Sequence, residues 1–152
     1  MNRKILFLCT GNYYRSRFAE MLFNHLATIH EHPWQAFSRG LAIELLEQDA
    51  GPISPHTLNG LAARSILLDE EVRDPIALAE ADLKEADHIV ALKQAEHLPL
   101  MLEKFPHWVE RVEFWHVHDI DMGMPHDALQ QIELEVHKLL WRLLPKEEYG
   151  DE

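Results

Sequence analysis

Residues 9–16 carry the side-chain types of a phosphoryl-transfer site. The segment reads Cys-Thr-Gly-Asn-Tyr-Tyr-Arg-Ser, and Arg15 follows Cys9 by six positions. A short loop that contains glycine and leads into a helix can wrap its backbone N–H groups around a tetrahedral anion. The helix N-terminus and Arg15 would also favour the thiolate form of Cys9, which is the nucleophilic form. The spacing therefore predicts a cysteine nucleophile beside a guanidinium that can pair with two phosphate oxygens.

The other side chains of this loop add groups for the same site. We expect the hydroxyl of Ser16 to donate to the sulfur, and Asn12 to pin the loop by bonding its backbone. Tyr13 either stacks against an aryl group of the substrate or fills a groove on the protein's own surface. Chance occurrence of the whole string in a strand-to-helix context is below about one in a thousand. The predicted phosphate-binding residues are Thr10, Gly11, Asn12, Tyr13, Tyr14, Arg15 and Ser16.

Strand-like and helix-like segments alternate along the chain. Apolar runs predict strands at residues 4–8, 34–38, 87–92 and 112–117. Helical spacing predicts helices from about residue 16, from residue 55, over 94–103 and over 127–144. This alternation predicts an α/β fold of three layers, a four-stranded parallel sheet with helices on both faces and the phosphate-binding loop after the first strand. Sites in such folds lie beyond the carboxyl ends of the strands, which here means residues 9–16, 38–41 and 118–124.

Length and charge narrow the class of partner. The chain has 152 residues, and we expect one domain over residues 1–152. A net charge of −12 argues against binding to nucleic acid. Residues 1–40 hold five cations against two anions, whereas the rest of the chain holds nine against 24. A small positive segment on an acidic body suits a small anionic ligand.

A single cysteine rules out an internal disulfide and any zinc site of the Cys/Cys/His kind. No apolar run approaches the roughly 18 residues of a membrane span, and no small-residue cleavage site follows the first residues. We therefore expect a cytoplasmic protein with no membrane contact. His116 and His118 could share one side of a strand end, but we expect neither a metal nor another cofactor. The oligomeric state is left open.

The loop and its surroundings resemble the low-molecular-weight protein tyrosine phosphatases. The resemblance covers essentially the whole chain, and it includes Ala19-Glu20, the strand at residues 34–38, and the run at residues 87–90. In that family a loop thiolate attacks phosphorus, an arginine holds the phosphoryl oxygens, and an aspartate on a distant loop protonates the leaving group.

The resemblance implies roles residue by residue. Cys9 is the implied nucleophile and Arg15 the implied phosphate ligand. Asn12 and Ser16 take the supporting roles of the family's loop, and Ser38 matches a serine that supports the asparagine.

The general acid has two candidates. Family members usually carry Asp-Pro before the last helix, whereas this chain reads His-Asp-Ile-Asp at residues 118–121. Counting back from the last helix aligns Asp119 with the family's acid, and Asp121 is the alternative. Either carboxyl could act, because a nearby bound dianion keeps such a group protonated to higher pH.

Three positions depart from the family pattern. Tyr14 stands where many relatives have a second loop cysteine, so no reversible loop disulfide can form. Arg17 replaces the usual proline. It either adds positive charge at the entrance of the site or is a solvated residue at the start of the helix, and we expect the solvated residue. A second-layer histidine of the family falls in a stretch that reads Val-Arg-Asp-Pro here, at residues 72–75.

These features predict a phosphomonoester hydrolase, a protein tyrosine phosphatase that works through a cysteinyl-phosphate. Its substrate would be a phosphotyrosine protein or a small aryl phosphate, and its product inorganic phosphate. Two alternatives stay open. One is a pseudophosphatase that binds phosphate or phosphoproteins without turnover, and the other is an arsenate reductase that borrows external thiols.

Overall fold

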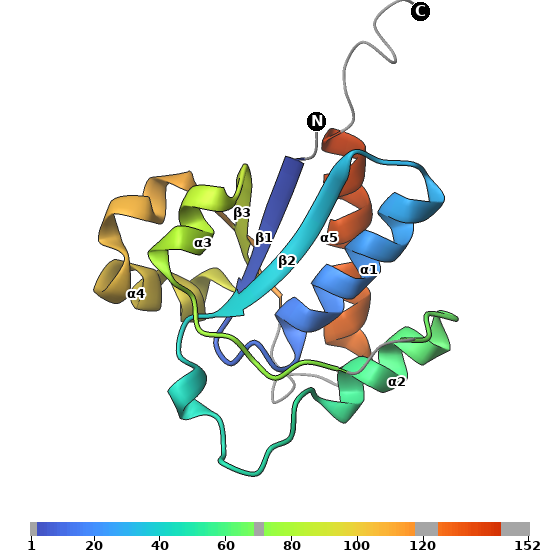
Figure 1. Cartoon of the computed structure of the whole chain (residues 1–152), viewed down its shortest axis with the longest axis horizontal. Coiled ribbons are helices and arrows are strands. Elements are labelled where there is room, and N and C mark those ends of the chain that lie inside the picture. Colours follow the sequence, from blue (N-terminus) through green and yellow to red (C-terminus); the bar gives the residue numbers. More distant parts are fainter. Residues whose placement is uncertain (1–2, 69–71, 118–124, 144–152) are drawn as a thin grey trace, which may run out of the picture.

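The four strands form one sheet in the order β2-β1-β3-β4 (Figure 1). A computed structural model of the chain describes residues 3–68, 72–117 and 125–143. The strands are β1 (Arg3–Cys9), β2 (Trp34–Gly40), β3 (His88–Ala91) and β4 (Val112–Phe114). Each neighbouring pair runs parallel, which confirms the predicted four-stranded parallel sheet.

Helices cover both faces of this sheet. Figure 1 shows α1 and α5 on one side of the strands, with α3 and α4 on the other. The predicted three-layer arrangement is therefore confirmed. The described helices are α1 (Arg15–Ile29), α2 (Pro55–Ala63), α3 (Glu80–Glu85), α4 (Gln94–Lys104) and α5 (Pro125–Arg142), with short 3-10 turns at Ile43–Leu45 and Pro106–Arg111. None of the helices within the described residues is long and apolar enough to cross a membrane.

The continuous apolar run of β1 follows from this layering. Successive side chains of a strand point to opposite faces, so the part of a strand that is covered on both sides is apolar at every position. Ile5 and Phe7 join the cluster that contains residues of α1 and α5. Leu6 and Leu8 join the cluster that contains residues of α3 and α4. All four side chains are fully buried.

Two elements differ from the sequence prediction. Strand β4 ends at Phe114, because the next residue turns toward the start of α4: the carbonyl of Trp115 accepts from the backbone N–H of Gln94 at 2.8 Å. Helix α3 was not predicted, since its six residues are too few to show helical periodicity.

We predict that Phe7→Ala destabilises the fold strongly. The Phe7 ring packs against Phe23 and Trp115, with ring centroids 5.9 and 5.8 Å apart. Deleting it leaves a cavity where β1 meets the helices, and we expect a loss of about 3–5 kcal/mol in the free energy of unfolding, measured with urea. Leu134→Ala on α5, whose side chain is 56% exposed, is the control and should change this value by less than about 0.5 kcal/mol. Similar losses for both variants would contradict the placement of the core.

Candidate active site

The predicted phosphate-binding loop connects β1 to α1 at the carboxyl edge of the sheet. Cys9 is the last residue of β1, and Arg15 is the first residue of α1. Gly40, at the end of β2, is the register partner of Cys9. The structure therefore brings together two of the three predicted loops, residues 9–16 and 38–41. The third, residues 118–124, lies outside the described residues.

A close approach of the backbone joins these two loops. A Cβ atom on Gly40 would lie 3.0 Å from the backbone nitrogen of Asn12 and 2.5 Å from Cγ2 of Ile43. Glycine lets the end of β2 lie against the loop without displacing Asn12 or Ile43. Asn12 itself has a positive φ of 51°, a conformation that asparagine tolerates better than most residues.

Five carbonyl groups of the loop accept hydrogen bonds from outside it. Since the N–H of a planar trans peptide points away from its C=O, these bonds turn the following N–H groups toward the interior of the loop. The loop thus presents backbone donors on its inner side, as an anion site requires. The five hydrogen bonds run from donor to acceptor as follows: Leu41 N to Cys9 O (2.9 Å), Ala42 N to Thr10 O (2.8 Å), Arg17 Nη1 to Asn12 O (3.2 Å), Ser54 N to Tyr13 O (2.9 Å) and Thr57 Oγ1 to Tyr14 O (3.0 Å).

A buried chain of polar side chains leads from the thiol of Cys9 to β2. The Cys9 Sγ lies 2.9 Å from Ser16 Oγ. The amide of Asn12 donates to Ser16 Oγ and to Ser38 Oγ, both at 2.9 Å. Because Ser16 already accepts from Asn12, its own proton is available to the sulfur. Ser38 in turn donates to Glu20 Oε1 at 2.5 Å. The residues predicted to support Cys9 therefore lie together.

Arg73 completes this chain from the segment where the family histidine was expected. Its Nη1 donates to Asn12 Oδ1 at 3.0 Å, and its Nη2 reaches Ser38 Oγ at 3.1 Å and Glu20 Oε1 at 3.2 Å. The Oδ1 of Asn12 also accepts from the backbone N–H of Ile76 at 3.0 Å. Sequence analysis missed Arg73 and Glu20, because the contacts of Arg73 with Asn12 and Glu20 span 61 and 53 positions.

Glu96, near the start of α4, holds Arg15. Its Oε2 accepts from Arg15 Nη2 at 3.0 Å and also from the hydroxyl of Thr10. The His97 ring, whose Nε2 lies 3.4 Å from this oxygen, and then the contacts with Thr10 and Arg15 hold the pKa of Glu96 far below its ordinary value. The carboxylate is therefore charged at neutral pH. It was also missed from sequence, since 81 positions separate it from Arg15.

The sequence prediction for the Arg17 side chain is wrong. We expected a solvated residue at the start of the helix, but the side chain is fully buried. Its Nη1 donates to the carbonyls of Asn12 (3.2 Å) and Pro52 (3.0 Å), and its Nη2 donates to the carbonyl of Arg73 (2.8 Å). The first turn of α1 is covered by the segments that carry Pro52 and Arg73, and this contact removes Arg17 from water.

The two loop tyrosines contact the protein's own chain. The hydroxyl of Tyr13 donates to the carbonyl of Ala50 at 2.7 Å, which favours the interpretation that Tyr13 fills a groove of its own surface. The ring of Tyr14 lies edge-on to His56, with centroids 6.0 Å apart. Burial raises the pKa of Tyr14 above its ordinary value.

The two candidate acids, Asp119 and Asp121, lie outside the described residues, as does His118. Within residues 3–68, 72–117 and 125–143, no group of three or more His, Cys, Asp or Glu side chains could hold a metal ion.

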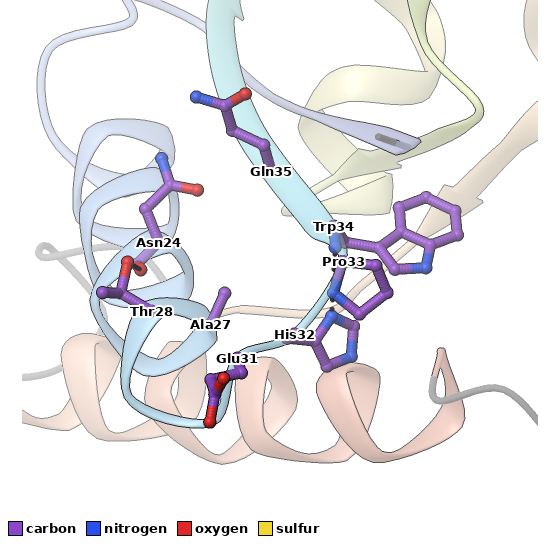
Figure 2. A pocket seen from close by; sticks show the side chains of 8 residues that line it. All are labelled: Asn24, Ala27, Thr28, Glu31, His32, Pro33, Trp34 and Gln35. Atoms are coloured by element: carbon purple, nitrogen blue, oxygen red, sulfur yellow. Dashed lines mark hydrogen bonds between the residues drawn. The ribbon is translucent and has the colours of Figure 1, made fainter. Parts of the chain in front are cut away.

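A separate pocket lies at the opposite end of β2. It has a volume of about 360 Å³, and Figure 2 shows its lining side chains from α1, from the following turn and from the start of β2. The amide of Asn24 accepts from the backbone N–H of Ala36 at 2.7 Å and donates to its carbonyl at 3.0 Å. This polar side chain therefore supports the outer edge of the sheet, away from the Cys9 loop.

Comparisons with known proteins agree with the geometry. The low molecular weight protein tyrosine phosphatase SP-PTP from Streptococcus pyogenes is 19% identical, with a TM-score of 0.81 and coverage of 98% of each chain. A low molecular weight protein tyrosine phosphatase from Bacillus subtilis is 27% identical, with a TM-score of 0.66 over 92% of this chain and 93% of that one. The YwlE arginine phosphatase from Geobacillus stearothermophilus is 21% identical, with a TM-score of 0.72 over 93% of this chain and 92% of that one.

No curated protein matches the sequence. The family model of low molecular weight phosphotyrosine protein phosphatase matches residues 4–148, almost the entire chain. With the sheet order, the Cys9 loop and this match in agreement, the chain belongs to the low molecular weight phosphotyrosine protein phosphatase family, a family of hydrolases.

Proposed function

We propose that this protein hydrolyses phosphotyrosine proteins or small aryl phosphates through a cysteinyl-phosphate on Cys9. The observation that carries this proposal is the outward hydrogen bonding of the loop carbonyls around Cys9, because it directs backbone N–H groups at the space above the sulfur. The same arrangement supports Thr10, Gly11, Asn12, Tyr13, Tyr14, Arg15 and Ser16 as the phosphate-binding residues.

In the first step the thiolate of Cys9 attacks phosphorus. An S–P bond forms, the P–O bond to the phenol breaks, and the leaving phenolate takes a proton from Asp119. Arg15 and the loop N–H groups stabilise the equatorial oxygens as they flatten in the transition state. The hydroxyl of Ser16, 2.9 Å from the sulfur, stabilises the thiolate.

In the second step a water molecule attacks phosphorus. The Asp119 carboxylate accepts a proton from this water, the S–P bond breaks, and inorganic phosphate leaves. Ser16 then donates to the returning thiolate, as it did before the first step. Glu96 orients the guanidinium of Arg15 throughout, since its carboxylate stays charged. No cofactor is needed for either step.

The first experiment measures hydrolysis of p-nitrophenyl phosphate between about pH 5 and 8. We expect Cys9→Ser to abolish turnover while phosphate still raises its melting temperature. Asp119→Asn should lower kcat by roughly 10²–10⁴-fold, because the leaving group loses its proton donor. Asp121→Asn is the matched control and should keep kcat within about threefold. A large loss for Asp121→Asn with little loss for Asp119→Asn would assign the acid to Asp121.

This assay, together with an assay of arsenate reduction, distinguishes the two alternative functions from the proposed one. A wild-type protein that binds phosphate without hydrolysing any aryl phosphate would be a pseudophosphatase, and the proposal would fail. An arsenate reductase would reduce arsenate with added glutathione. That reaction would need every further thiol from outside, since the chain has one cysteine.

Substrate class is the second test, because two structural relatives are described as arginine phosphatases. We expect a higher kcat/KM for a phosphotyrosine peptide than for the same peptide with phosphoarginine. The reason is that the family model matching residues 4–148 is one of phosphotyrosine protein phosphatases, whereas the arginine phosphatase from Geobacillus stearothermophilus is only 21% identical. A preference for phosphoarginine in the wild type would refute the assignment to tyrosine.

Oxidation provides a third test. Peroxide converts a reactive thiolate to sulfenic acid, and this chain has no second cysteine with which that acid could condense. We expect dithiothreitol to recover only the early fraction of activity, from sulfenic acid or a mixed disulfide, and sulfinic acid to accumulate in mass spectra. The cytoplasmic location that we propose would protect Cys9 from this loss.

Tyr14→Cys supplies the missing partner for that experiment. Its thiol can condense with the sulfenic acid of Cys9, which releases water and forms a disulfide that dithiothreitol reduces. Each protein is compared with its own starting activity. Dithiothreitol could restore no larger a fraction of activity to the variant than to the wild type. In that case the missing second cysteine would not be the reason for the poor recovery of the wild type.

A further inference from the structure

Arg17 joins three segments that are distant in sequence. Its guanidinium donates to carbonyls of the phosphate loop, of the turn before α2 and of the segment after α2, through Asn12, Pro52 and Arg73. No part of the side chain reaches solvent. The bonded carbonyl of Asn12 is one of the five whose orientation directs N–H groups into the loop. Arg17 therefore fixes the backbone of the loop from behind.

The charge of Arg17 is not neutralised by these bonds, because all three acceptors are uncharged carbonyl oxygens. Burial, and then the charge of Arg73, lower the pKa of Arg17 to about 10, while the charges of Glu20, Cys9 and Asp74 act in the opposite direction. The side chain thus stays cationic at neutral pH. Its Nε has no hydrogen-bond partner among the described residues.

A buried cation held only by neutral groups is expensive, because desolvation opposes it. A residue needed only for packing would be more stable as an apolar side chain of similar volume. Negative charge nearby offsets this cost. Glu20 and Asp74 supply part of it, and the adjacent loop would hold two further anions, the thiolate of Cys9 and a phosphate dianion.

We propose that Arg17 is a positioning residue of the phosphate loop, and that its buried positive charge stabilises both the Cys9 thiolate and the bound dianion. This inference rests on the proposed function, since it gives Arg17 a role in that reaction. Arg17 acts through the loop and through its electric field, and it does not touch the substrate.

The test compares Arg17→Met, which removes the charge, with Arg17→Lys, which keeps it and loses the planar fork. One measurement is the pH dependence of Cys9 alkylation by iodoacetamide. We expect the midpoint of this profile to rise by about one pH unit in Arg17→Met and to stay near the wild-type midpoint in Arg17→Lys. The second measurement is inhibition by inorganic phosphate, which should weaken about tenfold or more in Arg17→Met and be partly restored in Arg17→Lys.

Arg64→Met is the matched control. Arg64 is also largely buried, and it donates to the carbonyl of Gly60 at 2.8 Å and to Glu133 at 2.9 Å, away from the phosphate loop. We expect this variant to lose stability without any shift in the alkylation profile. Arg17→Gln keeps a donor for the carbonyls without the charge, and it replaces Arg17→Met in the comparison if that variant does not fold.

Two results would overturn the inference. One is an unchanged alkylation profile and unchanged phosphate inhibition in a folded variant without the charge, even if its melting temperature falls. The other is an equal shift in Arg17→Lys, which would show that the charge is irrelevant. Alkylation needs no turnover, and phosphate binding can be followed by its effect on the melting temperature. A wild type that fails to hydrolyse aryl phosphates would therefore refute the proposed function and leave this test intact.

Discussion

A planar peptide group cannot turn its oxygen and its hydrogen toward the same side, and the candidate site depends on this constraint. For N–H groups to face an anion, each carbonyl must find a partner behind the loop. Here the partners come from the residues after β2, from the start of α2 and from Arg17. The sheet and α2 are thus needed for the site as much as the loop itself.

Charge around the loop is arranged in two groups. In front, Arg15 is held by the Glu96 carboxylate. Behind the loop, Arg73 contacts Glu20, whereas Arg17 has carbonyl partners only. The protein has a net charge of −12, yet its two buried arginines, Arg15 and Arg17, both lie at this loop, which favours the binding of a dianion that we propose. Low exposure makes these charges act over a longer range than surface charges would.

The sequence predicted the parts of the structure that depend on short-range patterns. The buried run of β1, the Ser54-Pro55 start of α2 and the Cys9 loop each occupy a few consecutive residues, and all appear as expected. Arg17 was placed wrongly because burial of one charged side chain depends on segments that fold over it from elsewhere. Arg73, Glu20 and Glu96 were missed for the same reason, since no local pattern marks a partner 50 to 80 positions away.

The long reach of these contacts has a consequence for folding. The bond from Arg17 to Arg73 spans 56 residues, and the bond from Asn12 to Ile76 spans 64. Closing such long chain segments is entropically costly, so we expect these contacts to form after the local helices and the first strand pairs. During synthesis the nucleophile emerges from the ribosome long before the residues that shape its loop. The phosphate binding that we propose would therefore be acquired late, as a property of the nearly complete fold.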